Sequence, residues 1–141
     1  MFRKMRRFKQ QITNEECVEV LKGAKRGVLS VIGEDGYPYG LPVSHWYNEE
    51  DGKIYFHGAK AGHKLDAINA CDKVSFCAMD EGYREEGDWA LNIKSVIIFG
   101  RISFFSYEED PEKVREVCIG ISSKFTDDPN YADDEIAKVG K

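Results

Sequence analysis

Short turns separate the apolar segments in the first half of the chain, and their length limits the folds that are possible. The strand-like residues 28–32 are followed by a turn sequence at 33–36, after which a strand-like pattern runs over 37–47. A second turn sequence, 49–52, precedes the apolar residues 53–57. Parallel strands need a connection of a dozen or more residues. These segments therefore predict an antiparallel meander of three strands.

Helix signals lie on both sides of the strand region. Thr13 and Glu16 have the spacing of a capping box, and the apolar residues that follow predict a helix over about 14–22. Near the C-terminus, Pro111 suits a first helical turn, and an apolar stripe predicts a helix over about 110–126. We interpret that stripe as a surface that faces the core.

The remaining apolar segments predict one short helix and two more strands. Leu65–Ile68 suits a short helix, and residues 74–78 alternate as in a fourth strand. Residues 93–105 form one long apolar run, which we expect to bend or bulge at Gly100. The charged, glycine-rich loop 80–88 has no periodicity, so we expect it to be exposed or to belong to an interface.

Consecutive antiparallel strands with few helices favour a mainly β fold, a small closed or partly open β-barrel with flanking helices. The 141 residues fit a single domain, residues 1–141, with the barrel over about 26–106. No G-x-G-x-x-G follows the first strand, and no G-x-x-x-x-G-K-[ST] occurs. The sequence therefore does not support a Rossmann fold or a P-loop.

Charge and cysteine distribution narrow the class of function. The net charge of −5 argues against a nucleic-acid partner, and we interpret the basic residues 3–9 and the acidic residues 127–135 as solvated termini. The four cysteines show no C-x-x-C pair, so we predict mostly buried free thiols and no metal site. No apolar run approaches the roughly 20 residues of a membrane span. We therefore expect a soluble, cytoplasmic protein with no membrane partner.

The segment Ile54–Lys64, IYFHGAKAGHK, combines the features of a phosphate site. An apolar strand ends at His57, a turn of small residues follows, and Lys60, His63 and Lys64 gather where a helix begins. Amides at a helix start and cations both bind phosphate. Ordinary surface charge is the alternative for an isolated lysine, but the position after a strand and a glycine turn favours a phosphorylated ligand or cofactor.

Five sequence blocks, in this order, carry a resemblance to a known family. They are EDGYPYGLPVS at 34–44, IYFHGA at 54–59, GHKLD at 62–66, VSFC at 74–77 and KSVIIFG at 94–100. With these blocks the chain resembles the pyridoxamine 5′-phosphate oxidase-like FMN-binding split-barrel flavoproteins, and among them the nitroimidazole-resistance (Nim) branch. The resemblance runs from about Arg3 to Phe125.

This resemblance implies an antiparallel split barrel that forms a homodimer and binds FMN in a cleft between the two subunits. By position in the family pattern, the implied contacts from the flavin ring to the phosphate are Pro42, Val43 and Ser44, then His57, Gly58 and Ala59, and then Lys60, His63 and Lys64. Lys94 and Ser95 would reach the flavin from the other subunit.

The resemblance also implies redox chemistry carried by the flavin. The expected function is an FMN-dependent oxidoreductase: NAD(P)H reduces FMN, which then passes electrons to a small acceptor such as a nitroaromatic compound or a quinone. His57 is the candidate catalytic residue, since histidine is the side chain that most often donates a proton near neutral pH. The alternatives are a non-catalytic flavin carrier or sensor, a haem-binding protein, and an oxidase of the pyridoxamine-phosphate type, whose arginine-rich signatures are not visible.

Some residues near the blocks carry weaker signals. We interpret His45, which follows the Pro-Val-Ser block, as a solvent-facing strand residue. For Trp46, Tyr47 and Trp89 we favour packing in the core or in a subunit interface over stacking on a flavin. The family's usual last strand has no counterpart after Asp127, so we expect the open barrel edge to depend on the partner subunit.

Overall fold

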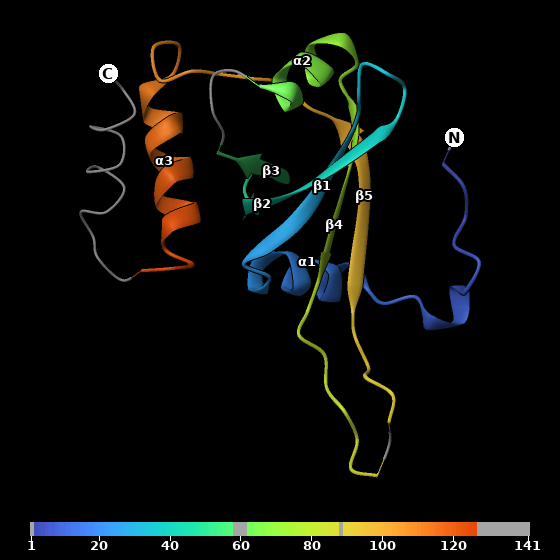
Figure 1. The fold of residues 1–141 in the computed structure, drawn as a ribbon. Helices are drawn as coiled ribbons and strands as arrows, with labels where there is room; N and C mark the ends of the chain where they lie inside the picture. The colour runs from blue at the N-terminus through green and yellow to red at the C-terminus, as the bar shows by residue number, and fades with distance from the viewer. Residues whose placement is uncertain (1, 58–61, 88, 127–141) are drawn as a thin grey trace.

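A curled antiparallel sheet forms the centre of the protein in a computed structural model that describes residues 2–57, 62–87 and 89–126 (Figure 1). The sheet has five strands in the order β3-β2-β1-β4-β5. These strands are β1 at Arg26–Ile32, β2 at Pro38–Asn48, β3 at Lys53–Phe56, β4 at Lys73–Met79 and β5 at Ser95–Arg101. The predicted mainly β class with flanking helices is confirmed, and the sheet forms a curled half-barrel.

Three α-helices flank the sheet in the described residues: α1 at Asn14–Gly23, α2 at His63–Ala70 and α3 at Pro111–Ser122. A short 3-10 helix, η1 at Phe8–Gln10, precedes α1. The capping box predicted at the start of α1 is present, because the Thr13 side chain accepts from the Glu16 N–H and the Glu16 carboxylate accepts from the Thr13 N–H. None of these helices is both long and apolar enough to cross a membrane.

The strand registers confirm the meander predicted from the short turns. β1 pairs antiparallel with β2 from Arg26↔Ser44 to Ile32↔Pro38, and β2 continues past β1 to pair with β3. The turn between β1 and β2 contains Gly36 at φ 82°, a conformation that favours glycine. The short turn that contains Gly36 therefore favours direct antiparallel pairing of β1 with β2.

The long strand predicted over residues 93–105 is wrong in its length and in its bend. β5 ends at Arg101, and Gly100 lies in unbroken register opposite Val74. The apolar sequence beyond β5 has a different role, since the ring of Phe105 packs edge-on against Tyr55 at 6.0 Å between centroids. The apolar side chain of Phe105 therefore packs in the segment that follows β5 and is not part of a strand.

One face of the sheet carries the hydrophobic core. Alternate residues of the central strands are buried there and pack with residues of α1 and α2: Leu29 and Val31 of β1, Phe76 and Ala78 of β4, Val96 of β5, Val20 and Leu21 of α1, and Ala67 and Ile68 of α2. The side chains of α1 and α2 thus cover this face. All four cysteines are free thiols, and they are half-buried where we predicted mostly buried ones.

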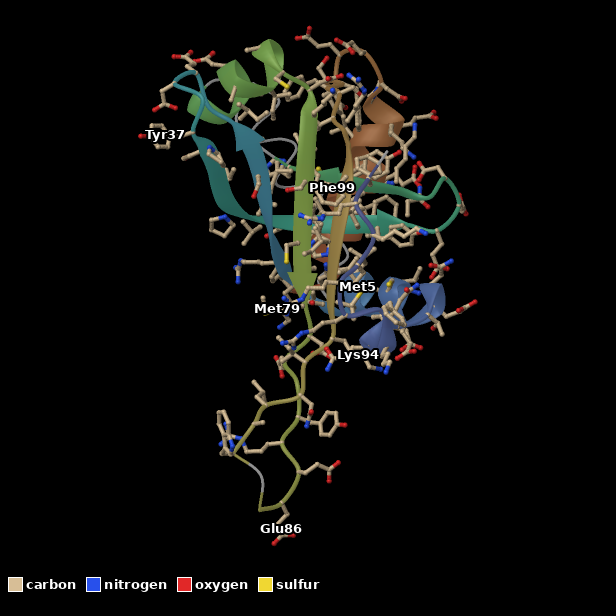
Figure 2. The ribbon with its side chains drawn as sticks, turned by 90° about the vertical axis from the view of Figure 1, so that its right-hand side faces the viewer. Met5, Tyr37, Met79, Glu86, Lys94 and Phe99 are labelled. Atoms are coloured by element: carbon tan, nitrogen blue, oxygen red, sulfur yellow. The ribbon has the colours of Figure 1, made fainter. Side chains whose placement is uncertain are left out.

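The opposite face of β1, β4 and β5, here called the outer face, exposes apolar side chains. Val28 and Ile32 of β1, Met79 of β4, and Ile97 and Phe99 of β5 are each 43% exposed or more. Figure 2 looks onto this side of the molecule and shows Phe99 and Met79 on neighbouring strands. Apolar side chains that gather on one face mark an interaction surface more often than scattered ones do.

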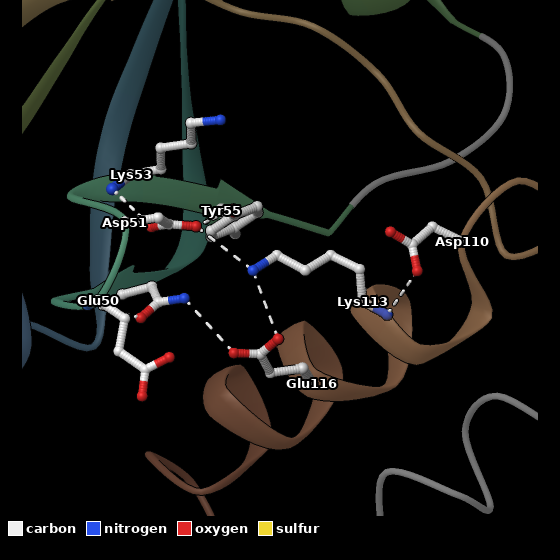
Figure 3. A network of polar contacts seen from close by, with 8 residues as sticks. Glu50, Asp51, Lys53, Tyr55, Asp110, Lys113 and Glu116 are labelled. Atoms are coloured by element: carbon white, nitrogen blue, oxygen red, sulfur yellow. Dashed lines mark hydrogen bonds and ion pairs between the residues drawn. The ribbon is translucent and has the colours of Figure 1, made fainter.

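Helix α3 is fixed to the β2–β3 hairpin by a polar network (Figure 3). The Lys113 ammonium lies 3.3 Å from the Asp51 carboxylate and 3.4 Å from that of Glu116, and 4.8 Å from the centre of the Tyr55 ring. The Tyr55 hydroxyl donates to Asp51, and this hydrogen bond lowers the pKa of the Asp51 carboxyl. The network holds α3 beside β3, so we assign it a structural role.

Candidate functional site

The three residues predicted to lie along a flavin ring are consecutive on β2. Pro42 pairs with Val28 of β1, and Ser44 pairs with Arg26, so both belong to the alternate row that β1 presents on its outer face. Val43 belongs to the other row and is only 7% exposed within the core. Pro42 is exposed and Ser44 is half-buried, whereas Val43 is enclosed.

His57 directly follows β3, and continuation of the β2–β3 register would place it opposite Ser44. The last pair of that ladder is His45↔Phe56, so His57 is the next residue along and is exposed. Neighbouring strands run about 4.8 Å apart. The candidate catalytic histidine and the Pro-Val-Ser block thus share one end of the sheet. Gly58, Ala59 and Lys60 lie outside the described residues.

Helix α2 begins close behind His57 along the chain. Gly62 is its N-cap at φ 139°, and no side-chain capping bond to the first turn occurs among the residues that the structure describes. His63 and Lys64 are the first two residues of the helix. The first N–H groups of a helix have no partner inside it, and they bind anions readily. This helix start is consistent with the predicted phosphate site.

Lys94 and Ser95 lie at the start of β5. Ser95 pairs with Met79 of β4, and the Lys94 ammonium forms an ion pair with the Glu16 carboxylate of α1 at 2.8 Å. The hydrogen bond to Glu16 raises the pKa of Lys94. An exposed ion pair of this kind contributes little to stability, because solvent screens it. Lys94 can therefore exchange Glu16 for another anion at small cost.

Within one copy of the chain, these predicted residues form two separate groups. β1 and β4 lie between β2 and β5, which puts Ser44 and Ser95 three strand spacings apart, or roughly 14 Å along the sheet. The structure brings Pro42, Ser44 and His57 together and leaves Lys94 and Ser95 apart from them. Within one copy, a site made of both groups would span three strand spacings.

His45 is fully buried, although we predicted that it faces solvent. It shares the core-facing row of β2 with Val43, a signal that strict alternation along the strand already contained. Its Nε2 donates to the Leu21 carbonyl at 2.8 Å, and its buried Nδ1 has no hydrogen-bond partner in the described residues. Burial lowers the pKa of His45, and the Lys124 ammonium, which donates to the His45 carbonyl at 2.9 Å, lowers it further. Burial also lowers the pKa of Lys124 to about 8.

The buried His45 predicts a loss of stability in mild acid. Because the folded protein favours the neutral ring, the unfolded chain takes up the proton first, and the free energy of unfolding falls as the pH drops below about 6.5. His45→Gln keeps an N–H for Leu21 and has no charge to gain. Urea unfolding at pH 7.5, 6.0 and 5.0 should show a smaller acid loss in His45→Gln than in the native chain, and equal losses would contradict this role.

The two tryptophans have opposite environments. Trp46 packs against α3, where a side-chain carbon built on Gly120 would meet its ring at 2.3 Å, and it lies 5.8 Å from Tyr55 between ring centroids. Trp89 is 89% exposed. Packing in the core is therefore confirmed for Trp46. Trp89 does not pack within the described part of the chain, and its place in a subunit interface stays a prediction.

Comparison with known proteins adds to this geometry. The family model for pyridoxamine 5′-phosphate oxidase matches residues 13–138, which is most of the chain. The chain belongs to the pyridoxamine 5′-phosphate oxidase family. The family resemblance expected from the five sequence blocks is thus confirmed. No curated protein matches this chain.

Solved structures agree with the family's fold. A conserved hypothetical protein, Rv2991 of Mycobacterium tuberculosis, matches with a TM-score of 0.78 and 17% identity over 98% of this chain and 81% of that protein. A proposed 5-nitroimidazole antibiotic resistance protein of Bacteroides thetaiotaomicron has a TM-score of 0.70 and 18% identity, covering 84% and 69% of the two chains. A FAD-binding protein of Mesorhizobium loti has a TM-score of 0.61 and 23% identity, covering 82% and 77%. At these identities the similarity establishes the split-barrel fold.

Proposed function

We propose that this member of the pyridoxamine 5′-phosphate oxidase family binds FMN and acts as an NAD(P)H-dependent reductase of small acceptors such as nitroaromatics or quinones. The observation that carries the proposal is the start of α2, where Gly62 leaves the first helical turn without a side-chain cap from the described residues, close behind the exposed His57. The structural neighbours described as a FAD-binding protein and as a nitroimidazole resistance protein support a flavin and this class of acceptor.

The phosphate of FMN is assigned to the start of α2, with Lys60, His63 and Lys64 around it. The phosphate carries up to two negative charges near neutral pH, so it needs cations as well as amides. One ion pair at 4 Å is worth about 4 kcal/mol at an effective dielectric constant of about 20, before desolvation costs. Two lysines beside a helix start supply the compensation that such an anion requires.

The flavin ring is assigned to the end of the sheet where β2 and β3 meet. Pro42 offers an exposed side chain there and Ser44 a half-buried one, while Val43, buried in the core, contributes through its main chain. Gly58 and Ala59 follow His57 and border the ring and the ribityl chain in this assignment. When bound, FMN supplies the electron transfer. His57 holds a proton beside the ring and donates it to the reduced acceptor.

The complete site needs a second copy of the chain. Lys94 and Ser95 lie three strands from Ser44, so in this proposal they reach the flavin of the partner subunit. The exposed apolar residues of the outer face support a homodimer, because such a face is costly to leave in water. A stable flavin-loaded monomer in size-exclusion chromatography would overturn the shared site.

The absorbance spectrum of the purified protein tests the cofactor first. Two flavin bands and release of FMN on denaturation are the expected result, whereas a Soret band near about 400 nm would establish haem. Anaerobic addition of NADH or NADPH should then bleach the flavin, and a nitroaromatic compound or a quinone should restore it. Tight FMN binding without bleaching, with or without acceptors, would replace the reductase by a flavin carrier.

A further inference from the structure

The connection between β4 and β5 is a long hairpin loop that extends away from the body of the protein (Figures 1 and 2). We call residues 80–87 and 89–94 the arm. Its two sides are joined by main-chain hydrogen bonds between Tyr83 and Asn92, at 2.7 and 2.8 Å, and from Asp80 N–H to the Lys94 carbonyl at 2.9 Å. In Figure 2 Glu86 lies at the far end, well beyond Lys94.

The shape of the arm is specific. Gly82 has φ 76°, and a side-chain carbon built there would lie 2.6 Å from Ile93 and 2.7 Å from the Asn92 carbonyl oxygen. Only glycine fits this position, because both the conformation and the close approach of the opposite strand exclude a side chain. The backbone of the arm therefore has a defined conformation at this position.

Large apolar side chains on the arm are left in water. Trp89 is 89% exposed, Tyr83 60%, Leu91 52% and Ile93 50%. A two-stranded ribbon without a packing partner is at best marginally stable. Exposed tryptophan and tyrosine are also the residues that most often anchor an interface. The arm thus has the composition of a surface that a partner covers.

The exposed apolar residues of the arm continue onto the outer face. Four exposed residues along the second side of the arm and β5 have sequence numbers that differ by two or four: Leu91, Ile93, Ile97 and Phe99. Residues at such spacing share one face of an extended chain. One partner lying along the outer face would therefore also cover the arm.

The arm and the N-terminal segment carry opposite charges. The arm has Glu81 near its base and Glu85 and Glu86 toward its far end, beside the cation Arg84. The N-terminal segment, residues 2–11, has five cations: Arg3, Lys4, Arg6, Arg7 and Lys9. All of these residues are exposed, and none of them forms an ion pair within the described part of the chain.

The N-terminal segment starts on the outer face. The ring of Phe2 stacks on Phe99 of β5 at 5.1 Å between centroids and 14° between planes. The first side of the arm, residues 80–87, extends about 26 Å at about 3.3 Å per residue, and the seven residues of β5 extend about 23 Å. An arm lying on the outer face of another copy is thus long enough to reach that copy's N-terminal segment.

We propose that the arm clasps a second copy of this chain, with its acidic tip against the basic N-terminal segment of that copy. The contact is isologous, since each copy carries both complementary surfaces and the pairing forms twice about a two-fold axis. Trp89 and the apolar row from Leu91 to Phe99 then pack in the interface, and the charges set its register. The inference rests on the homodimer of the proposed function.

Charge reversal with matched variants tests the arm. The arm variant carries Glu81→Lys, Glu85→Lys and Glu86→Lys, and the segment variant carries Arg3→Glu, Lys4→Glu and Arg6→Glu. A control variant, Glu34→Lys with Glu50→Lys and Glu108→Lys, makes the same charge change as the arm variant at exposed positions elsewhere. Sedimentation at low ionic strength gives the dimer Kd, and absorbance gives the FMN content.

The arm variant and the segment variant should each raise the dimer Kd at least tenfold, and the control variant should not. An equimolar mixture of the two should restore a dimer with one copy of each, because a basic arm then meets an acidic segment and an acidic arm meets a basic one. Native mass spectrometry detects this heterodimer. A pairing of arm and segment within one chain would give no such rescue.

Unchanged dimer Kd values in both variants, or a mixture that forms no heterodimer, would overturn the clasp. If the native chain is a flavin-loaded dimer with these results, only the inference about the arm fails. A native chain that is monomeric while carrying FMN overturns the shared site as well, and a native dimer that binds no flavin overturns the proposed function alone.

Discussion

Replacing Lys60 and Lys64 together with alanine is expected to weaken FMN binding by about 10²- to 10⁴-fold. Each lysine that donates to a charged phosphate oxygen contributes about 1.5–3 kcal/mol, and each 1.4 kcal/mol is tenfold in Kd. The amides at the start of α2 remain in the variant, so residual binding is expected. Quenching of FMN fluorescence on titration with the apoprotein measures the Kd.

The matched control is Lys22→Ala with Lys53→Ala, two exposed lysines on α1 and β3. It removes the same charge from the protein and should leave the FMN Kd within about twofold, since exposed lysines away from the site contribute little at physiological salt. Circular dichroism and the urea midpoint should be the same in both double variants. FMN affinity that is unchanged in Lys60→Ala with Lys64→Ala would place the phosphate elsewhere.

The substitution Gly120→Ala is expected to lower the free energy of unfolding by about 1–2 kcal/mol. A Cβ at this position would lie 2.3–2.5 Å from three ring atoms of Trp46, which a packed indole cannot give up without shifting. Overpacking of this kind costs about 1–3 kcal/mol, and the better helix propensity of alanine offsets up to about 1 kcal/mol of it. Urea unfolding followed by tryptophan fluorescence reports both stability and the environment of Trp46.

Gly23→Ala provides the matched comparison. Gly23 is also a helical glycine, at the end of α1, but a Cβ there would meet nothing within 4 Å and its φ is not positive. Alanine should be neutral or should stabilise the protein by up to about 1 kcal/mol. If Gly120→Ala were as benign as Gly23→Ala, the close contact between α3 and Trp46 would not exist in solution.

The sequence predicted the parts of the fold that depend on neighbouring residues. Turns at 33–36 and 49–52 are too short for a crossover, so the pairing of β1, β2 and β3 followed from them. The Thr13 capping box was equally local. The end of β5 was not predictable in this way, because the apolar residues after Arg101 look like strand until their tertiary packing is known.

The same limit applies to the candidate site. Its order along the chain was readable from the sequence blocks, but the distance between Ser44 and Ser95 depends on which strands come between them. His45 was misjudged for a related reason. Its alternation with Val43 pointed inward, and only the contacts with Leu21 of α1 and with Lys124, just after α3, show that a histidine is tolerated there. Whether a polar side chain can be buried in a core depends on partners that are far away in the sequence.

The order of the strands also constrains how the chain can fold. β1, β2 and β3 pair with their neighbours in sequence, and so do β4 and β5, whereas the ladder Val28↔Cys77 to Ser30↔Ser75 joins residues more than forty positions apart. Closing a loop of that length costs about 3 kcal/mol of chain entropy, which is lost before the ladder forms. Ser44 and His57 belong to the first of these local units, and Ser95, with Lys94 directly before it, belongs to the second. Neither unit alone contains the whole set of candidate residues. The pairing of β1 with β4 is therefore the folding step that brings them into one sheet.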